Sequence, residues 1–75
     1  MAGRERSEIS ALIACARLGG PYAAFVLDQL RVRFGASRPP TIDVAIALDT
    51  SERNIRRLYH ALDRNRHERV RALAA

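Results

Sequence analysis

The apolar positions of the chain fall into stretches with helical spacing, and clusters of Gly, Pro and short polar residues separate these stretches. A first helix is expected over residues 8–18, after a frayed N-terminus formed by residues 1–7. Gly19-Gly20-Pro21 ends this helix and opens the next, because Gly suits a helix C-terminus and Pro suits the first helical position. The i, i+3, i+4, i+7 spacing of a buried face is carried by Ile9, Leu12, Ile13 and Ala16.

A second helix is expected over residues 21–34, again with a single apolar face. Gly35 ends this helix, and the segment 36–40 that follows is a linker stiffened by a pair of prolines. The apolar face consists of Val26, Leu27, Leu30 and Phe34, with Tyr22 and Phe25 at its edge.

Residues 41–62 have the pattern of two short helices joined by a tight turn. Thr41 suits the N-cap of the first helix, which covers residues 42–48. Asp49 stands three residues before Glu52, which is the spacing of a capping box, so the second helix starts near Thr50 or Ser51. The inward-facing positions are Val44, Ala45 and Leu48 in the first helix and Ile55, Leu58 and Leu62 in the second.

The absence of any strand pattern predicts an all-α fold, a single domain over residues 1–75 built as a small bundle of four to five helices. Residues 63–75 leave two alternatives open. Arg66 and Arg69 fall on the stripe that was apolar up to Leu62. A buried continuation of the helix is not expected, because two unpaired arginines are costly to bury. Either the helix continues into solvent, or it breaks near Asn65 and a short tail helix follows.

Composition narrows the functional classes. A chain of 75 residues with 48% hydrophobic content forms one small core, and it contains no nucleophile–base pair, carboxylate pair or phosphate loop, so no enzyme is expected. Cys15 is the single cysteine, and no Cys and His residues have the spacing of a zinc site, so no metal is expected. No cofactor motif or small-molecule site is evident either. The sequence has no apolar run of membrane-spanning length and no signal-peptide block. A cytoplasmic protein is therefore expected.

Positive charge is concentrated in the last third of the chain. Residues 1–49 contain six Arg and five acidic residues, a net charge of +1, whereas residues 50–75 contain seven Arg and three acidic residues, a net charge of +4. All thirteen basic residues are Arg, which binds phosphate and guanine edges bidentately. A genome rich in G and C explains the absence of Lys equally well, so the asymmetry is the stronger indication of a nucleic-acid partner.

The second helix of the 41–62 segment has two distinct faces on a helical wheel. Ile55, Leu58, Tyr59 and Leu62 share one side. Asn54, on one shoulder of the other side, is a side chain that pairs bidentately with adenine, and Thr50 and Ser51 lie where a helix N-terminus holds phosphate. The opposite side carries a basic stripe of Arg53, Arg57, His60 and Arg64, with Arg56 beside it.

Residues 41–58 resemble the helix-turn-helix of bacterial, phage and plasmid regulators. With the 21–34 helix in front, the order is also similar to the start of winged-helix domains, although no hairpin signal for a wing follows Leu62. In this family the turn usually holds Gly because its backbone φ is positive, and Asp49, which stands here, tolerates that geometry better than most residues. The matching positions are Val44, Ala45, Leu48, Ser51, Ile55 and Leu58.

The resemblance implies sequence-specific binding of double-stranded DNA by a recognition helix over about 51–62, in a small transcriptional regulator or a phage or plasmid accessory factor. A homodimer is expected, because one recognition helix reads few base pairs; residues 8–18 are the preferred dimer surface and the C-terminal tail is the alternative. The candidate DNA-binding residues are Thr50, Ser51, Arg53, Asn54, Arg56, Arg57, His60 and Arg64, together with Arg38 from the linker.

A protein-binding function is the competing hypothesis. An adaptor or inhibitor with a basic helical face would dock on an acidic partner, and an arginine-rich face is in many proteins simply solvated. A gel shift with random duplex DNA at two salt concentrations separates the two hypotheses, because DNA binding through phosphate contacts is strongly salt-dependent.

Overall fold

A computed structural model describes the backbone of residues 2–74 and the side chains of residues 7–66. The chain forms four helices, and the described residues contain no strand, which confirms the expected all-α fold. The helices are α1 (Ala2–Leu18), α2 (Pro21–Phe34), α3 (Thr41–Ala47) and α4 (Glu52–Ala74). None of these helices combines the length and the apolar character needed to cross a membrane in the part of the chain that is described.

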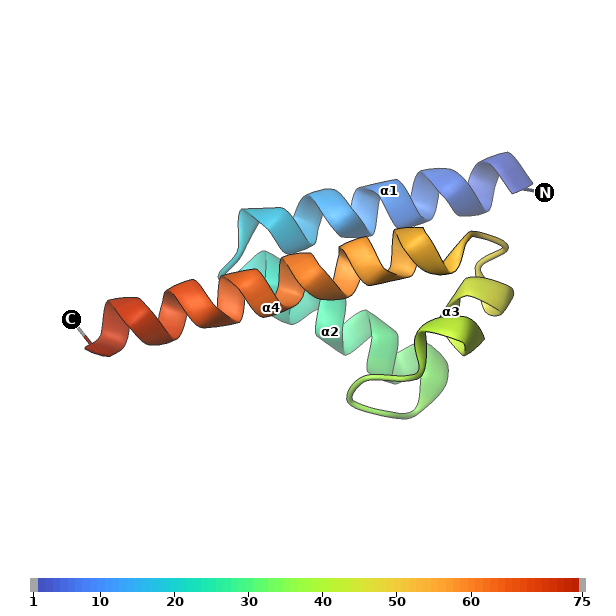
Figure 1. The fold of residues 1–75 in the computed structure, drawn as a ribbon. Coiled ribbons are helices and arrows are strands. Elements are labelled where there is room, and N and C mark those ends of the chain that lie inside the picture. Colours follow the sequence, from blue (N-terminus) through green and yellow to red (C-terminus); the bar gives the residue numbers. More distant parts are fainter. Residues whose placement is uncertain (1, 75) are drawn as a thin grey trace.

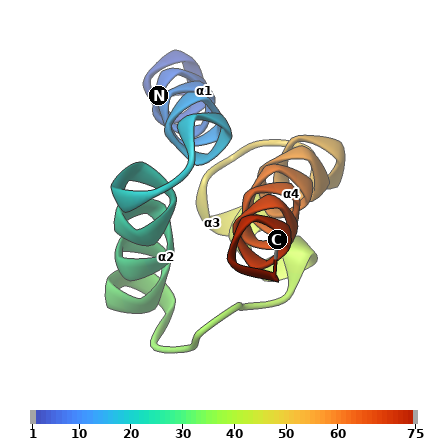
Figure 2. The same ribbon diagram turned by 90° about the vertical axis from the view of Figure 1, so that its left-hand side faces the viewer.

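The two long helices α1 and α4 lie side by side and run in the same direction (Figure 1). The short helix α3 packs on the first turns of α4, and α2 runs back along α1 in the opposite direction. Seen from the end, α2 and α4 lie on two different sides of α1 (Figure 2). The closest backbone packing therefore joins α1 to α4, α1 to α2 and α3 to α4, but not α2 to α4.

The core takes its side chains from all four helices. The sequence predicts a dimer surface on residues 8–18 of α1. Within a single chain, however, Ile9 and Ala16 of this segment are only 1% and 0% exposed. The apolar stripe of α1 is therefore not available for a second copy, because α4 and α2 already cover it. The buried residues are Ile9, Leu12, Ile13, Ala16, Val26, Leu30, Val44, Ala45, Leu48, Ile55, Leu58, Tyr59, Ala61 and Leu62.

The ends of α2 agree with the sequence prediction. Pro21 occupies the start of the helix, and Gly35 caps its end with a left-handed backbone (φ 67°) and an N–H that donates to the Arg31 carbonyl at 2.8 Å. Gly19, just before α2, has a φ of 73°, which favours glycine. A Cβ at this position would also lie 3.1 Å from Oδ1 of Asn65, so the Asn65 side chain would have to shift to admit it.

Several helix boundaries differ from the sequence prediction. The first helix begins at Ala2 and not at residue 8. The polar residues 2–7, which were expected to fray, are therefore helical. Thr41 is the first residue of α3, and Pro40 takes the N-cap position with its carbonyl accepting from the N–H of Val44 at 3.2 Å. In α4 the helix begins at Glu52, later than expected.

The C-terminal segment continues α4. The helix runs without a break from Glu52 to Ala74, so of the two alternatives for residues 63–75 the structure has the continuous helix. Its last part extends past the other three helices (Figure 1). The side chain of Arg69, one of the two arginines on which the alternatives depended, lies outside the described residues.

Candidate nucleic-acid interface

Residues 48–51 join α3 to α4, and one of them has a positive φ. Asp49 has a φ of 50°, the left-handed conformation that the sequence analysis expected at this turn. Its N–H donates to the Ile46 carbonyl at 3.2 Å, and the N–H of Thr50 donates to the Ala45 carbonyl at 2.9 Å. These two bonds form a Schellman motif, in which a left-handed residue closes the end of a helix and reverses the chain. The expected tight turn is therefore present, with Asp in the place that usually holds Gly.

Ser51 caps the start of α4. Its Oγ accepts from the backbone N–H of Asn54 at 3.2 Å, which satisfies one of the free N–H groups of the first turn. The expected capping box between Asp49 and Glu52 does not form, because Asp49 lies two residues before Ser51, the residue that caps α4, and closes α3 instead.

Asn54 and Thr50 are bonded to each other. The Asn54 amide Nδ2 donates to the Thr50 hydroxyl Oγ1 at 2.8 Å, and both side chains are partly buried. Asn54 also lines a hollow against the α1 residues Ser10 and Ala14. The structure thus uses these two predicted DNA-binding residues to hold the first turn of α4. This bond uses one of the two N–H groups of the Asn54 amide and fixes the orientation of the side chain.

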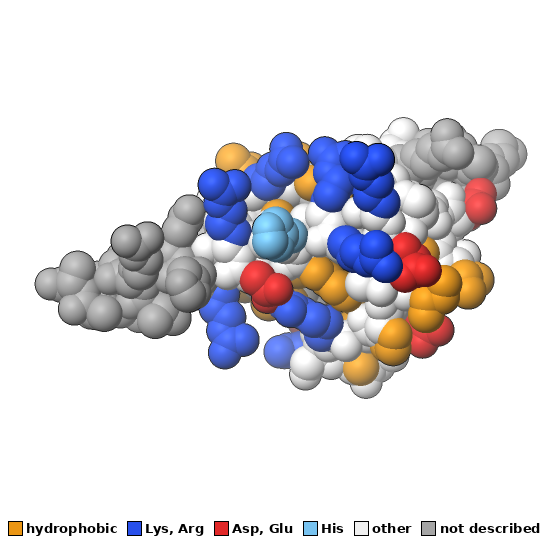
Figure 3. All heavy atoms as spheres, viewed as in Figure 1, with side chains coloured by type: hydrophobic (Ala, Val, Ile, Leu, Met, Phe, Trp, Pro, Cys, Tyr) orange, Lys and Arg blue, Asp and Glu red, His pale blue; other side chains and the backbone are white. Residues whose placement is uncertain are grey.

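The basic stripe lies on the outer face of α4. The four side chains and the neighbouring Arg56 are all exposed, while Ile55 and Leu58 on the opposite side are fully buried. Figure 3 shows basic side chains gathered over α4 and its border with α1. Arg56 pairs with Glu52 one turn earlier at 3.3 Å, and this pair lies on the edge of the stripe. The structure therefore brings Arg53, Arg57, His60 and Arg64 together on one solvent-facing surface.

The packing of α1 beside α4 adds an arginine that the sequence analysis missed. Arg17 lines two shallow hollows between these helices, of about 460 and 200 Å³, and Arg57 lines both of them as well. His60 and Arg64 line the larger one. No local signal marks Arg17, because its neighbourhood depends on α1 lying alongside α4 in the same direction.

Arg38 lies away from the stripe, on the flank of α4 that faces α2. Its guanidinium pairs with Asp63 at 2.8 Å and stacks over the Tyr59 ring at 5.1 Å from the ring centre. The Tyr59 hydroxyl donates in turn to the Pro39 carbonyl. Burial raises the pKa of Tyr59, and the nearby Arg38 charge opposes this rise. The structure therefore gives Arg38 a role in fixing the linker to α4.

The outer surface of α3 differs in character from that of α4. Its sequence contains no basic residue, and its exposed side chains include Asp43 and the apolar Ile42 and Ile46, the last of which is 72% exposed. Asp49 is exposed immediately after it. Phosphate groups would be repelled here, so a polyanion is not expected to contact the outer surface of α3.

The fold and this surface define a small all-α domain of four helices with a basic outer face on its longest helix. No family model matches the chain, and neither the curated proteins nor the solved structures give a match.

Proposed function

We propose that the protein binds double-stranded DNA through the outer face of α4, as a small sequence-specific regulator or a phage or plasmid accessory factor. The observation that carries this proposal is the exposed basic stripe on a helix that follows a tight, Schellman-closed turn. This is the arrangement in which the second helix of a helix-turn-helix enters the major groove.

The charges around the stripe support a polyanionic partner. Glu52 and Asp63 stand at its edge, and each is ion-paired with an arginine, Arg56 and Arg38 respectively. The stripe therefore presents arginines and a histidine to solvent, and among the side chains of residues 7–66 no carboxylate lies between them. A surface of this kind attracts phosphates over a distance comparable to the Debye length, about 8 Å at physiological salt.

The size of the stripe suits one segment of a groove. Arg53 and Arg64 are eleven residues apart in α4, which corresponds to about 16 Å at about 1.5 Å per residue. The major groove, about 12 Å wide, admits a helix, and this length covers about half of a DNA turn of about 34 Å. Arg53 and Arg57 would read base edges, while Arg17 and Arg64 would contact phosphates from the border of α1 and α4.

One such helix reads few base pairs, so the proposed complex is a homodimer on a palindromic site. Selection of bound fragments from a pool of random duplexes tests this directly. We expect an enriched site with two inverted half-sites, and we expect Arg53→Ala to relax the preference at defined positions of each half. A protein that enriches no sequence, or whose preference survives Arg53→Ala unchanged, contradicts the proposal.

A protein-binding adaptor is the second candidate, and the exposed apolar side chains favour it. Ile42 and Ile46 project from α3, and Tyr22, Phe25 and Val32 project from one side of α2. Exposed apolar groups of this size commonly mark protein contacts. Failure to bind duplex DNA at low salt, together with capture of an acidic protein partner that Arg57→Ala abolishes, would favour the adaptor.

A further inference from the structure

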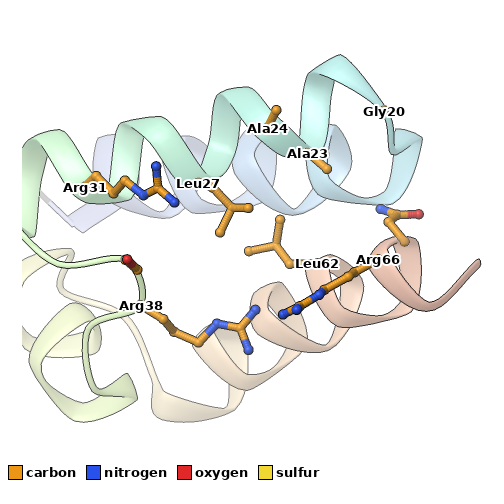
Figure 4. A pocket seen from close by; sticks show the side chains of 10 residues that line it. Gly20, Ala23, Ala24, Leu27, Arg31, Arg38, Leu62 and Arg66 are labelled. Atoms are coloured by element: carbon orange, nitrogen blue, oxygen red, sulfur yellow. The ribbon is translucent and has the colours of Figure 1, made fainter. Parts of the chain in front are cut away.

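A cleft of about 470 Å³ separates α2 from the second half of the described part of α4. Figure 4 shows Leu27 of α2 and Leu62 of α4 pointing toward each other, with the small side chain of Ala23 beside them. The cleft exists because α2 packs closely on α1 and not on α4. Its volume falls within the range of about 300–1,000 Å³ that is typical of small-molecule sites.

Three arginines from three segments surround this apolar floor. Arg31 comes from α2, Arg38 from the linker and Arg66 from α4, and Figure 4 shows their side chains around the opening. Among the described residues, no carboxylate lines the cleft. The Asp63 partner of Arg38 is exposed and is not among the lining residues, and no ion pair is found for Arg31 or Arg66 among the described side chains. Three like charges around one opening repel one another, and an anion bound between them would relieve that repulsion.

One end of the cleft carries an unsatisfied donor. Asn65 lines the cleft next to the Gly20 turn, and its amide Nδ2 is buried with no hydrogen-bond partner in the described part of the chain. A buried donor without an acceptor is uncommon and costs stability. An oxygen atom brought to this end by a ligand would supply the missing acceptor.

We infer that the arginine-rimmed cleft, defined by Leu27, Leu62, Arg31, Arg38, Arg66 and Asn65, binds a small organic carboxylate. The planar guanidinium forks match a carboxylate bidentately, and the leucine floor receives the apolar body of the same molecule. A bare inorganic anion would leave the half-buried Leu27 uncovered, and an apolar cation would be repelled by the arginines. This site lies on the opposite side of α4 from the basic stripe and does not depend on DNA binding.

Titration of the full chain with 2-naphthoate, followed by ¹H–¹⁵N NMR, tests the inference. We expect saturable shifts at the amides of Ala23, Leu27 and Leu62, with a dissociation constant of about 1 mM or tighter for a ligand of this size. Inorganic phosphate and 2-naphthylmethylammonium serve as probes that each lack one half of the proposed ligand. Equal binding of either probe, or the absence of saturable shifts with naphthoate, overturns the inference.

Charge-matched variants locate the site. Arg31→Gln combined with Arg66→Gln should weaken naphthoate binding at least about tenfold, since it removes charge-assisted bonds to the carboxylate. Arg53→Gln combined with Arg57→Gln removes the same charge from the other side of α4 and should leave the dissociation constant unchanged. Leu27→Ala, which removes apolar surface from the cleft without touching an arginine, should also weaken naphthoate binding. An equal loss in both double variants would mean that the effect comes from net charge, and would overturn the assignment.

Discussion

The backbone conformation of Asp49 sets the geometry of the turn between α3 and α4. Its φ of 50° allows the bonds from Asp49 to Ile46 and from Thr50 to Ala45 to close α3 and direct the chain into α4. An L-residue in this conformation is strained by roughly 1–2 kcal/mol, and Asp less than most because its short polar side chain is tolerated there. The turn is therefore formed at some cost in stability.

Replacement of Asp49 by Gly should relieve that strain. We expect the free energy of unfolding of Asp49→Gly to increase by up to about 1 kcal/mol, because Gly adopts positive φ without a steric penalty. The matched control is Ala14→Gly on the exposed side of α1, which should lower it by about 1 kcal/mol. Urea denaturation of both variants measures the two effects. A destabilised Asp49→Gly would show that the Asp side chain, and not the backbone conformation, holds the turn.

Tyr59 makes the stability of the fold sensitive to alkaline pH. Burial raises the pKa of its hydroxyl above the ordinary value of 10.0, so the folded state favours the neutral phenol. This stabilisation is fully present below pH 10.0 and is lost as the pH rises through the folded-state pKa, because the unfolded chain releases the proton first.

The variant Tyr59→Phe removes both the hydrogen bond to Pro39 and the titrating hydroxyl, and the two effects appear at different pH. At neutral pH the variant should be less stable by about 1 kcal/mol, because the bond to the Pro39 carbonyl is lost. Above pH 10.0 its stability should fall less steeply than that of the wild type. Tyr22→Phe, at an exposed position, is the control and should leave the wild-type profile unchanged. Identical alkaline profiles for Tyr59→Phe and the wild type would contradict the role given to burial.

Some residue-level features could be predicted from the sequence and others could not. The outward direction of Arg53, Arg57 and His60 follows from 100° per residue in a helix whose other side is apolar. The bond between Asn54 and Thr50 was missed, because the choice between an internal partner and a base depends on side-chain rotamers. The tie of Arg38 to Asp63 joins residues 25 positions apart, and only the folded chain brings them together.

At the scale of elements, α1 is the helix whose role changed most. Its apolar stripe was correctly predicted, but the same stripe suits packing within one chain or against a second copy. The parallel packing of α1 on α4 settles this in favour of the core. The ends of α2 were predictable, because Pro21 and Gly35 leave few alternatives. The start of α4 was harder to predict, because Asp49, Thr50 and Ser51 are all residue types that suit an N-cap.

The core role of α1 predicts a contrast between its buried and exposed apolar residues. Ile9→Ala should lower the free energy of unfolding by about 2–5 kcal/mol, because a large side chain is removed from a fully enclosed site. Leu18→Ala, where the side chain is 69% exposed, should change it by less than about 0.5 kcal/mol. Thermal unfolding monitored by circular dichroism compares the two. Similar effects of both substitutions would argue that α1 does not belong to the core.

The N-terminus of α4 should depend on its cap. Ser51→Ala removes the acceptor for the Asn54 N–H and should lower the free energy of unfolding by about 1 kcal/mol. Ser37→Ala, at an exposed position in the linker, is the control and should have an effect below about 0.5 kcal/mol. Chemical denaturation distinguishes the two, and a neutral Ser51→Ala would place the cap on another residue of the turn.

At the scale of the whole molecule, charge divides the surface into distinct regions. The sequence located the positive excess after Asp49, and the fold converts it into an exposed stripe on α4 that Arg17 of α1 extends. The acidic and apolar surface of α3 lies next to the start of this stripe. A duplex bound to α4 would therefore be expected to lean toward α1 and away from α3.

The salt dependence of duplex binding tests the central claim most directly. Fluorescence anisotropy with a labelled random duplex, between about 50 and 200 mM salt, gives the slope of log K against log[salt], which is about −0.9 per phosphate neutralised. We expect binding by the wild type and a slope made shallower by about 2 in the Arg17→Ala and Arg64→Ala double variant, which removes the two proposed phosphate contacts. The Arg31→Ala and Arg66→Ala double variant, with the same change in net charge, should keep the wild-type slope. Absence of binding at the lowest salt, or an equal change of slope in both double variants, would contradict DNA binding through the outer face of α4.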